Sequence, residues 1–268
     1  MTDSTNMKAR ASKHKTGDKV LKNKNYIFDR KRFFEKYRNE FGRIKNSKLV
    51  ANIETFLSFI EKDRSYNSIT EIAYVMATVK HETGHTFKPE REKYNGKKSE
   101  YFGEKYGPAV YKNGKKVSGH KDAQRMLHVS KVDGAKYYGR GYVQITWKRN
   151  YQDLGRSCNI AGLVEDPDKA LEPKNAYCIL AQGMQKGQFR PPHKLEDFFG
   201  NEKSNYEEAR DIVNANGDKK ELIAGYARQF EEILKFSFGQ PAQNAPNLND
   251  KSHVKTTPAE TPAADVVP

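Results

Sequence analysis

The sequence predicts a mainly α-helical domain flanked by two polar tails. Apolar residues recur at helical spacing through much of residues 26–238, and 14 Phe and 15 Tyr supply a core. Residues 1–25 carry a net charge of +5, whereas residues 239–268 hold five of the 11 prolines and no aromatic residue. We therefore expect a flexible basic arm at 1–25, one domain at 26–238 and a disordered Pro/Ala-rich tail at 239–268.

The helices are predicted by apolar stripes and by capping residues. The second stripe follows a cap at Asn46 or Ser47, and the third opens with a capping-box pattern at 68–71. A further helix is expected over 175–186, after the Asp-Pro and Glu-Pro pairs at 166–173. The four stripes are Phe34, Tyr37, Phe41 and Ile44; Val50, Ile53, Leu57 and Ile60; Ile72, Val75, Met76 and Val79; and Leu222, Ile223, Tyr226, Phe230, Ile233 and Leu234.

Residues 85–140 are rich in Gly, Lys and Tyr and show weak periodicity. We interpret them as a long, partly ordered excursion from the helical domain. Excursions of this length within a compact domain usually serve a function.

The sequence HETGH at 81–85 matches the zinc-peptidase pattern H-E-x-x-H. That chemistry needs His81 and His85 on one face of a continuing helix, with a third ligand such as Glu104. Gly84 and Pro89 predict that the helix stops first. A zinc metallopeptidase is kept as an alternative, although we expect no metal and no cofactor.

Glu82 itself has a second interpretation. It continues the apolar stripe of its helix, so its carboxyl group is expected to be partly buried at the negative helix end, where the protonated form is favoured. A protonated carboxylic acid is what a glycosidase needs in order to protonate a leaving oxygen. The alternative is a structural ion pair with Lys80, Arg91 or Arg140.

Residues 137–151, YYGRGYVQITWKRNY, form the densest motif. Val143 and Ile145 alternate with Gln144 and Thr146, which predicts a short strand with two polar groups on one face. Aromatic rings beside amide and hydroxyl groups suit the apolar faces and polar edges of a sugar chain. A purely structural, aromatic-rich hairpin is the alternative.

Together, the helix ending in His-Glu-Thr, the variable loop and the Gly-Arg-Gly motif resemble glycoside hydrolase family 19, which contains chitinases and phage-type endolysins. Residues 165–171 and 214–217 resemble later family motifs. The resemblance implies a lysozyme-like, two-lobed helical domain with a small β-hairpin region. The chain departs from the family pattern in its basic stretch 106–133, and it lacks the several disulfides of the plant members.

The resemblance also implies roles for single residues. Glu82 would be the general acid, and Glu92 fits best as the second carboxylate, with Glu90, Glu100 and Glu104 as alternatives. The family inverts the anomeric carbon, which implies roughly 6.5–9.5 Å between the two carboxyl groups. Thr146 would help to hold the catalytic water. The implied sugar-binding residues are Tyr138, Arg140, Gln144, Trp147, Asn150 and Asn216.

The formal net charge is +14, of which residues 26–238 keep +10. Such a charge favours polyanionic partners. Since no helix-turn-helix, zinc-finger or RNP pattern is seen, a nucleic-acid partner is not expected. An anionic cell envelope fits better, so we favour peptidoglycan as the substrate and keep chitin as the alternative.

No apolar run is long enough for a membrane span, and no secretory signal is visible. We expect a monomer that accumulates in the cytoplasm and acts on the cell wall after holin-type release, the last step by analogy. Cys158 and Cys178 fit a reducing compartment, and packing is the role preferred over a disulfide.

Overall fold

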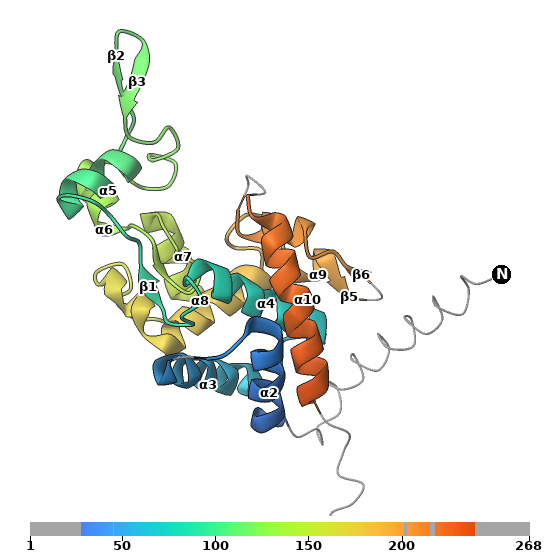
Figure 1. The fold of residues 1–268 in the computed structure, drawn as a ribbon. Helices are drawn as coiled ribbons and strands as arrows, with labels where there is room; N and C mark the ends of the chain where they lie inside the picture. Colours follow the sequence, from blue (N-terminus) through green and yellow to red (C-terminus); the bar gives the residue numbers. More distant parts are fainter. Residues whose placement is uncertain (1–27, 45, 201–202, 215–217, 239–268) are drawn as a thin grey trace, which may run out of the picture.

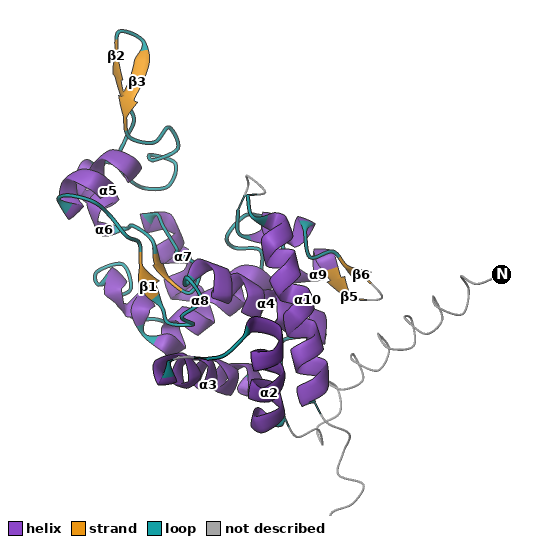
Figure 2. Ribbon diagram, in the orientation of Figure 1, coloured by secondary structure: helices purple, strands orange, loops and turns teal. Residues whose placement is uncertain are grey.

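The computed structural model describes residues 28–44, 46–200, 203–214 and 218–238, which are mainly helical (Figures 1 and 2). The predicted arm at 1–25 and tail at 239–268 lie outside these residues. The elements follow one another as α2 (Arg30–Phe41), α3 (Ser47–Lys62), α4 (Ile69–Glu82), β1 (Glu90–Arg91), α5 (Lys98–Tyr106), β2 (Val110–Lys112), β3 (Lys115–Ser118), α6 (Lys131–Lys136), β4 (Arg140–Gly141), α7 (Lys148–Ser157), η1 (Pro167–Leu171), α8 (Pro173–Gln185), α9 (Leu195–Phe198), β5 (Phe199–Gly200), β6 (Lys203–Ser204), η2 (Glu208–Ile212) and α10 (Lys220–Ser237).

Helix α4 is the centre of the core. Its residues 69–80 are all buried, and α10 packs along it while α2 packs against α10 (Figure 1). The Ser68 hydroxyl accepts a hydrogen bond from the Glu71 amide at 3.1 Å, which caps the helix as its sequence predicts. In α3, the Asn46 side chain is the cap. Helices α2 and α10 contain their predicted stripes, except that Ile44 lies beyond the end of α2, and α8 begins and ends within a few residues of its predicted range.

Residues 85–140 are more ordered than their weak periodicity suggested. Helices α5 and α6 pack against each other, and the antiparallel hairpin β2–β3 projects from them, away from the rest of the molecule (Figure 2). Each helix is short, so too few turns were present for a period to show in the sequence.

Two expectations about the motif region and the cysteines were wrong. No strand covers residues 143–146: β4 is only Arg140–Gly141, and the chain then turns back so that Ile145 bridges to Arg140. Cys158, at the end of α7, and Cys178, in α8, form a disulfide with their Cα atoms 5.8 Å apart. Because these helices pack against each other, their ends bring together cysteines that are 20 residues apart.

Within the described ranges, no helix combines the length and the apolar character that crossing a bilayer requires.

Candidate active site

Glu82 is the last residue of α4, as predicted. The helix stops there because Gly84 and His85 adopt positive φ values of 58° and 71°. The Thr83 side chain closes the end, accepting from the Phe87 amide at 3.0 Å and donating to the Val79 carbonyl at 2.7 Å.

This ending separates the two histidines of the H-E-x-x-H pattern. His85 lies past the helix, where its Nε2 atom is 3.2 Å from the hydroxyl of Tyr226. The described residues contain no group of three His, Cys, Asp or Glu placed to hold a metal ion. The continuing helix that a zinc peptidase needs is therefore not formed.

The partner of Glu82 is Arg210, which lies in η2. Its Nη1 atom is 2.7 Å from Oε1 of Glu82, and the two side chains are only 6% and 17% exposed. The Nε atom of Arg210 also donates to the Asp218 carbonyl at 3.3 Å. Glu82 is thus half-buried, as expected, and the Arg210 guanidinium stands beside its carboxyl group.

The three cations considered as partners of Glu82 are engaged elsewhere. The Lys80 ammonium lies 4.2 Å from the ring centre of Phe41, and burial lowers its pKa to about 8. Arg91 and Arg140 each lie 2.7 Å from a carboxylate oxygen of Asp168. These pairs hold strands β1 and β4 against η1.

Glu92 is placed by the pairing of β1 with β4. Its amide donates to the Gly139 carbonyl at 2.8 Å, and its carboxylate accepts from the Gly139 amide at 3.1 Å. Two donors from the end of α5 complete its shell: the Lys105 ammonium at 2.7 Å and the Tyr106 hydroxyl at 2.9 Å from both carboxylate oxygens. This network holds a carboxylate in one orientation.

Tyr106 is a permanent donor in this network. Burial and the neighbouring Glu92 carboxylate raise the pKa of Tyr106 well above its usual value, so its phenol keeps its proton. The Thr146 hydroxyl lies close enough to interact with it, and Thr146 also donates to the Gln144 carbonyl at 3.0 Å.

The other carboxylates that the sequence left open lie differently. Glu100 and Glu104 are 67% and 62% exposed and pair with lysines on the surface. Glu90 lies in β1 opposite Gly141, and its carbonyl accepts from the Gln144 amide group at 2.9 Å. Of the four, Glu92 is the carboxylate enclosed by donors beside the motif.

The motif turn is strained at two bulky residues. Gln144 and Trp147 have φ values of 54° and 81°. Residues other than glycine rarely adopt this region of backbone conformation. Such strain is typical of functional sites, where surrounding contacts enforce it. Here Gln144 is held by Glu90, and the Asn150 side chain donates to the Thr146 carbonyl at 2.8 Å.

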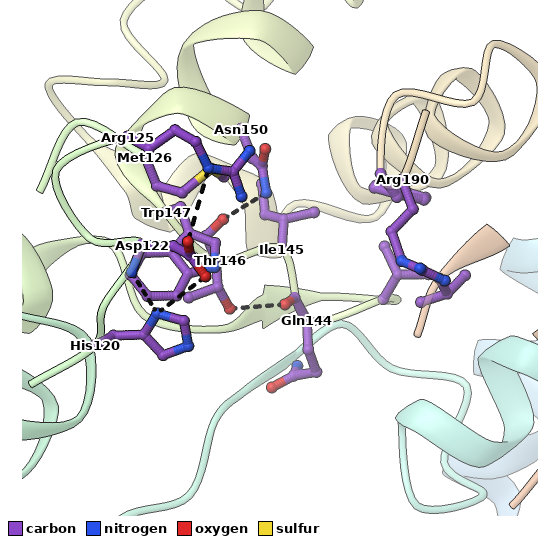
Figure 3. A pocket seen from close by; sticks show the side chains of 13 residues that line it. His120, Asp122, Arg125, Met126, Gln144, Ile145, Thr146, Trp147, Asn150 and Arg190 are labelled. Carbon is purple, nitrogen blue, oxygen red and sulfur yellow. Dashed lines mark hydrogen bonds and ion pairs between the residues drawn. The ribbon is translucent and has the colours of Figure 1, made fainter. Parts of the chain in front are cut away.

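An open pocket of about 290 Å³ lies along this turn (Figure 3). Gln144, Thr146, Trp147 and Asn150 line it on one side. Other lining residues come from the loop after the β2–β3 hairpin and from segments near η2, and these are His120, Asp122, Arg125, Met126, Phe189, Arg190 and Val213. Polar groups and aromatic rings meet in this pocket, which suits a sugar chain.

Neither Glu82 nor Glu92 lines the pocket. Glu92 adjoins it through Gln144. The side-chain amide oxygen of Gln144 and a carboxylate oxygen of Glu92 each lie 3.0 Å from the position that a Cβ atom would take on Gly139. Glu82 adjoins it through Arg210, because η2 is followed directly by the lining residue Val213. The partners of the two carboxyl groups, Arg210 and Gly139, therefore lie in segments that lead into residues lining the same pocket.

Tyr138 and Arg140 are not placed to touch a sugar. They are 1% and 3% exposed, and the Arg140 guanidinium lies 3.8 Å from the ring centre of Tyr138. Arg140 also donates to the carbonyls of Lys136 and Tyr138, at 2.9 Å and 3.0 Å. They support the motif turn from inside, since a buried guanidinium needs these partners. Asn216 lies outside the described residues.

Several residues of the site were missed from the sequence. Arg210 is 128 positions from Glu82, and no local pattern distinguishes it from other arginines. Lys105, Tyr106 and His120 lie in the excursion for which the sequence predicts a function, but only the packing of α5 shows which of its residues face the motif. The His120 ring contacts that of Trp147, with ring centres 4.9 Å apart.

Comparisons with known proteins place the chain in a family. The sequence model of the family described as Chitinase class I, which is glycoside hydrolase family 19, matches residues 31–177. Chitinase C from Streptomyces griseus is similar over 81% of this chain and 97% of its own, with 19% identity and a TM-score of 0.46. A bacterial family 19 chitinase is similar over 81% and 98%, with 19% identity and a TM-score of 0.39. No curated protein matches.

Proposed function

This chain belongs to glycoside hydrolase family 19, and we propose that it hydrolyses the β-1,4-linked amino-sugar polymer of the bacterial cell wall, peptidoglycan. The observation that carries the proposal is the presence of two carboxyl groups, Glu82 and Glu92, whose partners Arg210 and Gly139 lie in segments that lead into one polar, aromatic pocket. Such a pair of acids is what glycoside hydrolysis needs.

Glu82 is the proposed general acid. In its protonated form it delivers a proton to the oxygen that leaves the anomeric carbon, and its carboxylate remains. Arg210, 2.7 Å away, stabilises that carboxylate as it forms.

Glu92 is the proposed base. It takes a proton from a water molecule, whose oxygen then bonds to the anomeric carbon from the face opposite the leaving group, so the configuration inverts. Thr146, which lines the pocket beside Gln144, is suited to hold this water through its hydroxyl. The mechanism requires roughly 6.5–9.5 Å between the carboxyl groups, and it uses no metal.

Gln144, Trp147 and Asn150 are the proposed sugar-binding residues, because all three line the pocket. Asn216 remains a proposed member of this set. Tyr138 and Arg140 are proposed instead to position the turn that carries them, since both are buried.

Charge supports peptidoglycan as the substrate, because residues 26–238 carry a net charge of +10 and peptidoglycan bears carboxylates. Chitin, which is neutral, is the second candidate, favoured by the description of the family. Action on the wall after release from the cytoplasm remains part of the proposal.

The test compares wild type with Glu82→Gln and Glu92→Gln on permeabilised bacterial cells and on chitin. Glutamine has nearly the same shape as glutamate but lacks the carboxyl group that transfers the proton, so the turnover of each variant is expected to fall about 10²–10⁴-fold. Glu104→Gln is the matched control, because this carboxylate is 62% exposed and lies on the surface. Melting temperatures check folding, since Glu82→Gln leaves the Arg210 cation without its counter-charge.

Each outcome has one meaning. Lysis that resists EDTA and disappears in both variants supports the proposal. Lysis that EDTA abolishes and zinc restores would contradict the metal-free mechanism. Cleavage of chitin with intact cells would keep the acid–base mechanism and show that the substrate choice is wrong.

A further inference from the structure

The β2–β3 hairpin, residues 110–118, is exposed to an extent that packing does not explain. Every residue of both strands is exposed except Ser118. Tyr111 and Val117 are 60% and 59% exposed, and Val110 is 43% exposed. The hairpin stands away from the helices (Figure 1). Its side chains therefore contribute little to the core, and a surface role has to account for them.

The charge of this segment is of one sign. Residues 105–121 contain no Asp or Glu, while Lys112, Lys115 and Lys116 lie in the hairpin and Lys121 follows it. Within the part of the chain that the structure describes, none of these four lysines forms an ion pair. Lysines on both strands beside an exposed tyrosine make a surface that attracts anions and offers an aromatic ring.

The base of the hairpin is fixed, in contrast to its exposed strands. The amides of Gly119 and His120 donate to the carbonyls of Glu104 and Gly107, at 2.7 Å and 2.8 Å. Gly119 has a φ of 77°, and a Cβ atom there would lie 2.0 Å from the Pro108 carbonyl oxygen, so only glycine fits. The hairpin is thereby held in a set direction relative to α5.

The same base continues into the active-site pocket. His120 packs against Trp147, and His120, Asp122 and Arg125 line the pocket (Figure 3). Arg125 is 70% exposed, and its only carboxylate neighbour among the described residues is Asp122, at 3.9 Å. The pocket and the base of the hairpin therefore share His120.

We propose that the β2–β3 hairpin is a second binding site for the substrate, which holds carboxylate-bearing peptidoglycan next to the pocket. The ligand groups are the carboxylates of the peptide stems on the glycan, which chitin lacks. The exposed Tyr111 ring adds an apolar face for a sugar or a peptide methyl group. This inference rests on the proposed function and names the surface that selects the anionic substrate.

The test is binding of purified sacculi by the triple variant Lys112→Gln, Lys115→Gln, Lys116→Gln. All proteins carry Glu82→Gln, so that the polymer stays intact. We expect about tenfold weaker binding at low salt, because each exposed charge contact contributes modestly, and a smaller difference at high salt. Tyr111→Ala is expected to weaken binding at both salt concentrations.

The matched control is Lys31→Gln, Lys62→Gln, Lys174→Gln, which makes the same change of net charge on exposed lysines of α2, α3 and α8. It is expected to bind sacculi as the parent does. A second arm uses sacculi whose carboxyl groups have been amidated: the parent should then bind no better than the hairpin variant. Both triple variants, with Glu82 restored, should hydrolyse a short neutral oligosaccharide within twofold of wild type.

Two results would overturn the proposal. One is equal binding of sacculi by the hairpin variant and the control, and the other is an equal loss of binding to chitin. Failure of wild type to cleave sacculi would contradict the proposed function instead, and the binding comparison would still decide the role of the hairpin.

Discussion

At the scale of single residues, Tyr106 connects the excursion to the proposed chemistry. It closes α5, donates to both oxygens of Glu92 and lies beside Thr146. Because its phenol stays protonated, it cannot itself accept the proton of the attacking water. It is therefore a positioning residue, which sets how the Glu92 carboxylate faces the pocket.

Tyr106→Phe is expected to lower kcat about 10- to 100-fold, with a change in KM of less than threefold. The substitution keeps the ring but frees Glu92 from one of its three donors, and a small misplacement of a reacting group has a large effect on rate. Steady-state kinetics on a soluble oligosaccharide measure both constants. Tyr101→Phe, the same change on the same helix, is the control, and equal kcat values in the two variants would contradict the prediction.

Local sequence patterns predict some residues of the candidate site but not others. The partly buried position of Glu82 at the end of a helix was predicted, because an apolar stripe and a helix end are local features that are visible in the sequence. Its partner Arg210 was not, because an ion pair between residues 128 positions apart depends on the folding of η2 against α4. The burial of Arg140 was missed for the same reason, since Asp168 comes to it from η1.

At the scale of elements, His128 joins α5 to α7. Its ring is fully buried. Its Nδ1 atom lies 2.9 Å from the carbonyl of Tyr106, and its Nε2 atom lies 2.9 Å from the amide of Lys148. Since a carbonyl accepts and an amide donates, the ring is neutral with its proton on Nδ1. A second proton on Nε2 would break the bond to α7.

The free energy of unfolding is therefore expected to fall as the pH decreases below about 6.5. Burial lowers the pKa of His128, and burial also lowers the pKa values of His81 and His85. Below the unfolded pKa of about 6.5, the unfolded chain binds protons that the folded chain resists, so stability is lost until the lowered folded pKa is passed. Each histidine contributes at most about 1.4 kcal/mol per pH unit.

Urea unfolding between pH 5 and 8 measures this slope. His128→Asn removes one titrating group, so its slope should be shallower than that of wild type, although the variant is less stable at pH 8 by about 1–3 kcal/mol. If the free energy of unfolding changes with pH equally steeply in the two proteins, His128 does not titrate in this way.

The same scale explains which elements were predictable. Helices α3, α4 and α10 run for 14 to 18 residues and present several turns of one stripe. Helices α5 and α6 have nine and six residues, and they are stabilised mainly by packing on each other. In the turn after β4, apolar and polar residues alternate as they do in a strand. The positive φ values of this turn fall on Gln144 and Trp147, and neither Gln nor Trp is a residue type that predicts a turn.

At the scale of the whole molecule, the disulfide ties the motif helix to the second half of the core. Cys158 ends α7, whose first turn carries the pocket residue Asn150, and Cys178 lies in α8, which packs against α3 and α7. The bond closes a loop of 20 residues. Restricting the unfolded chain in this way is expected to stabilise the protein by about 3 kcal/mol.

The double variant Cys158→Ser, Cys178→Ser should therefore melt at a lower temperature than oxidised wild type, with the same kcat/KM well below that temperature, because neither cysteine lines the pocket. Adding a reductant to wild type should lower its melting temperature to that of the variant, which itself should not respond. A wild-type protein whose melting temperature ignores the reductant would contradict this role, since the loop-closure effect acts only while the bond is intact.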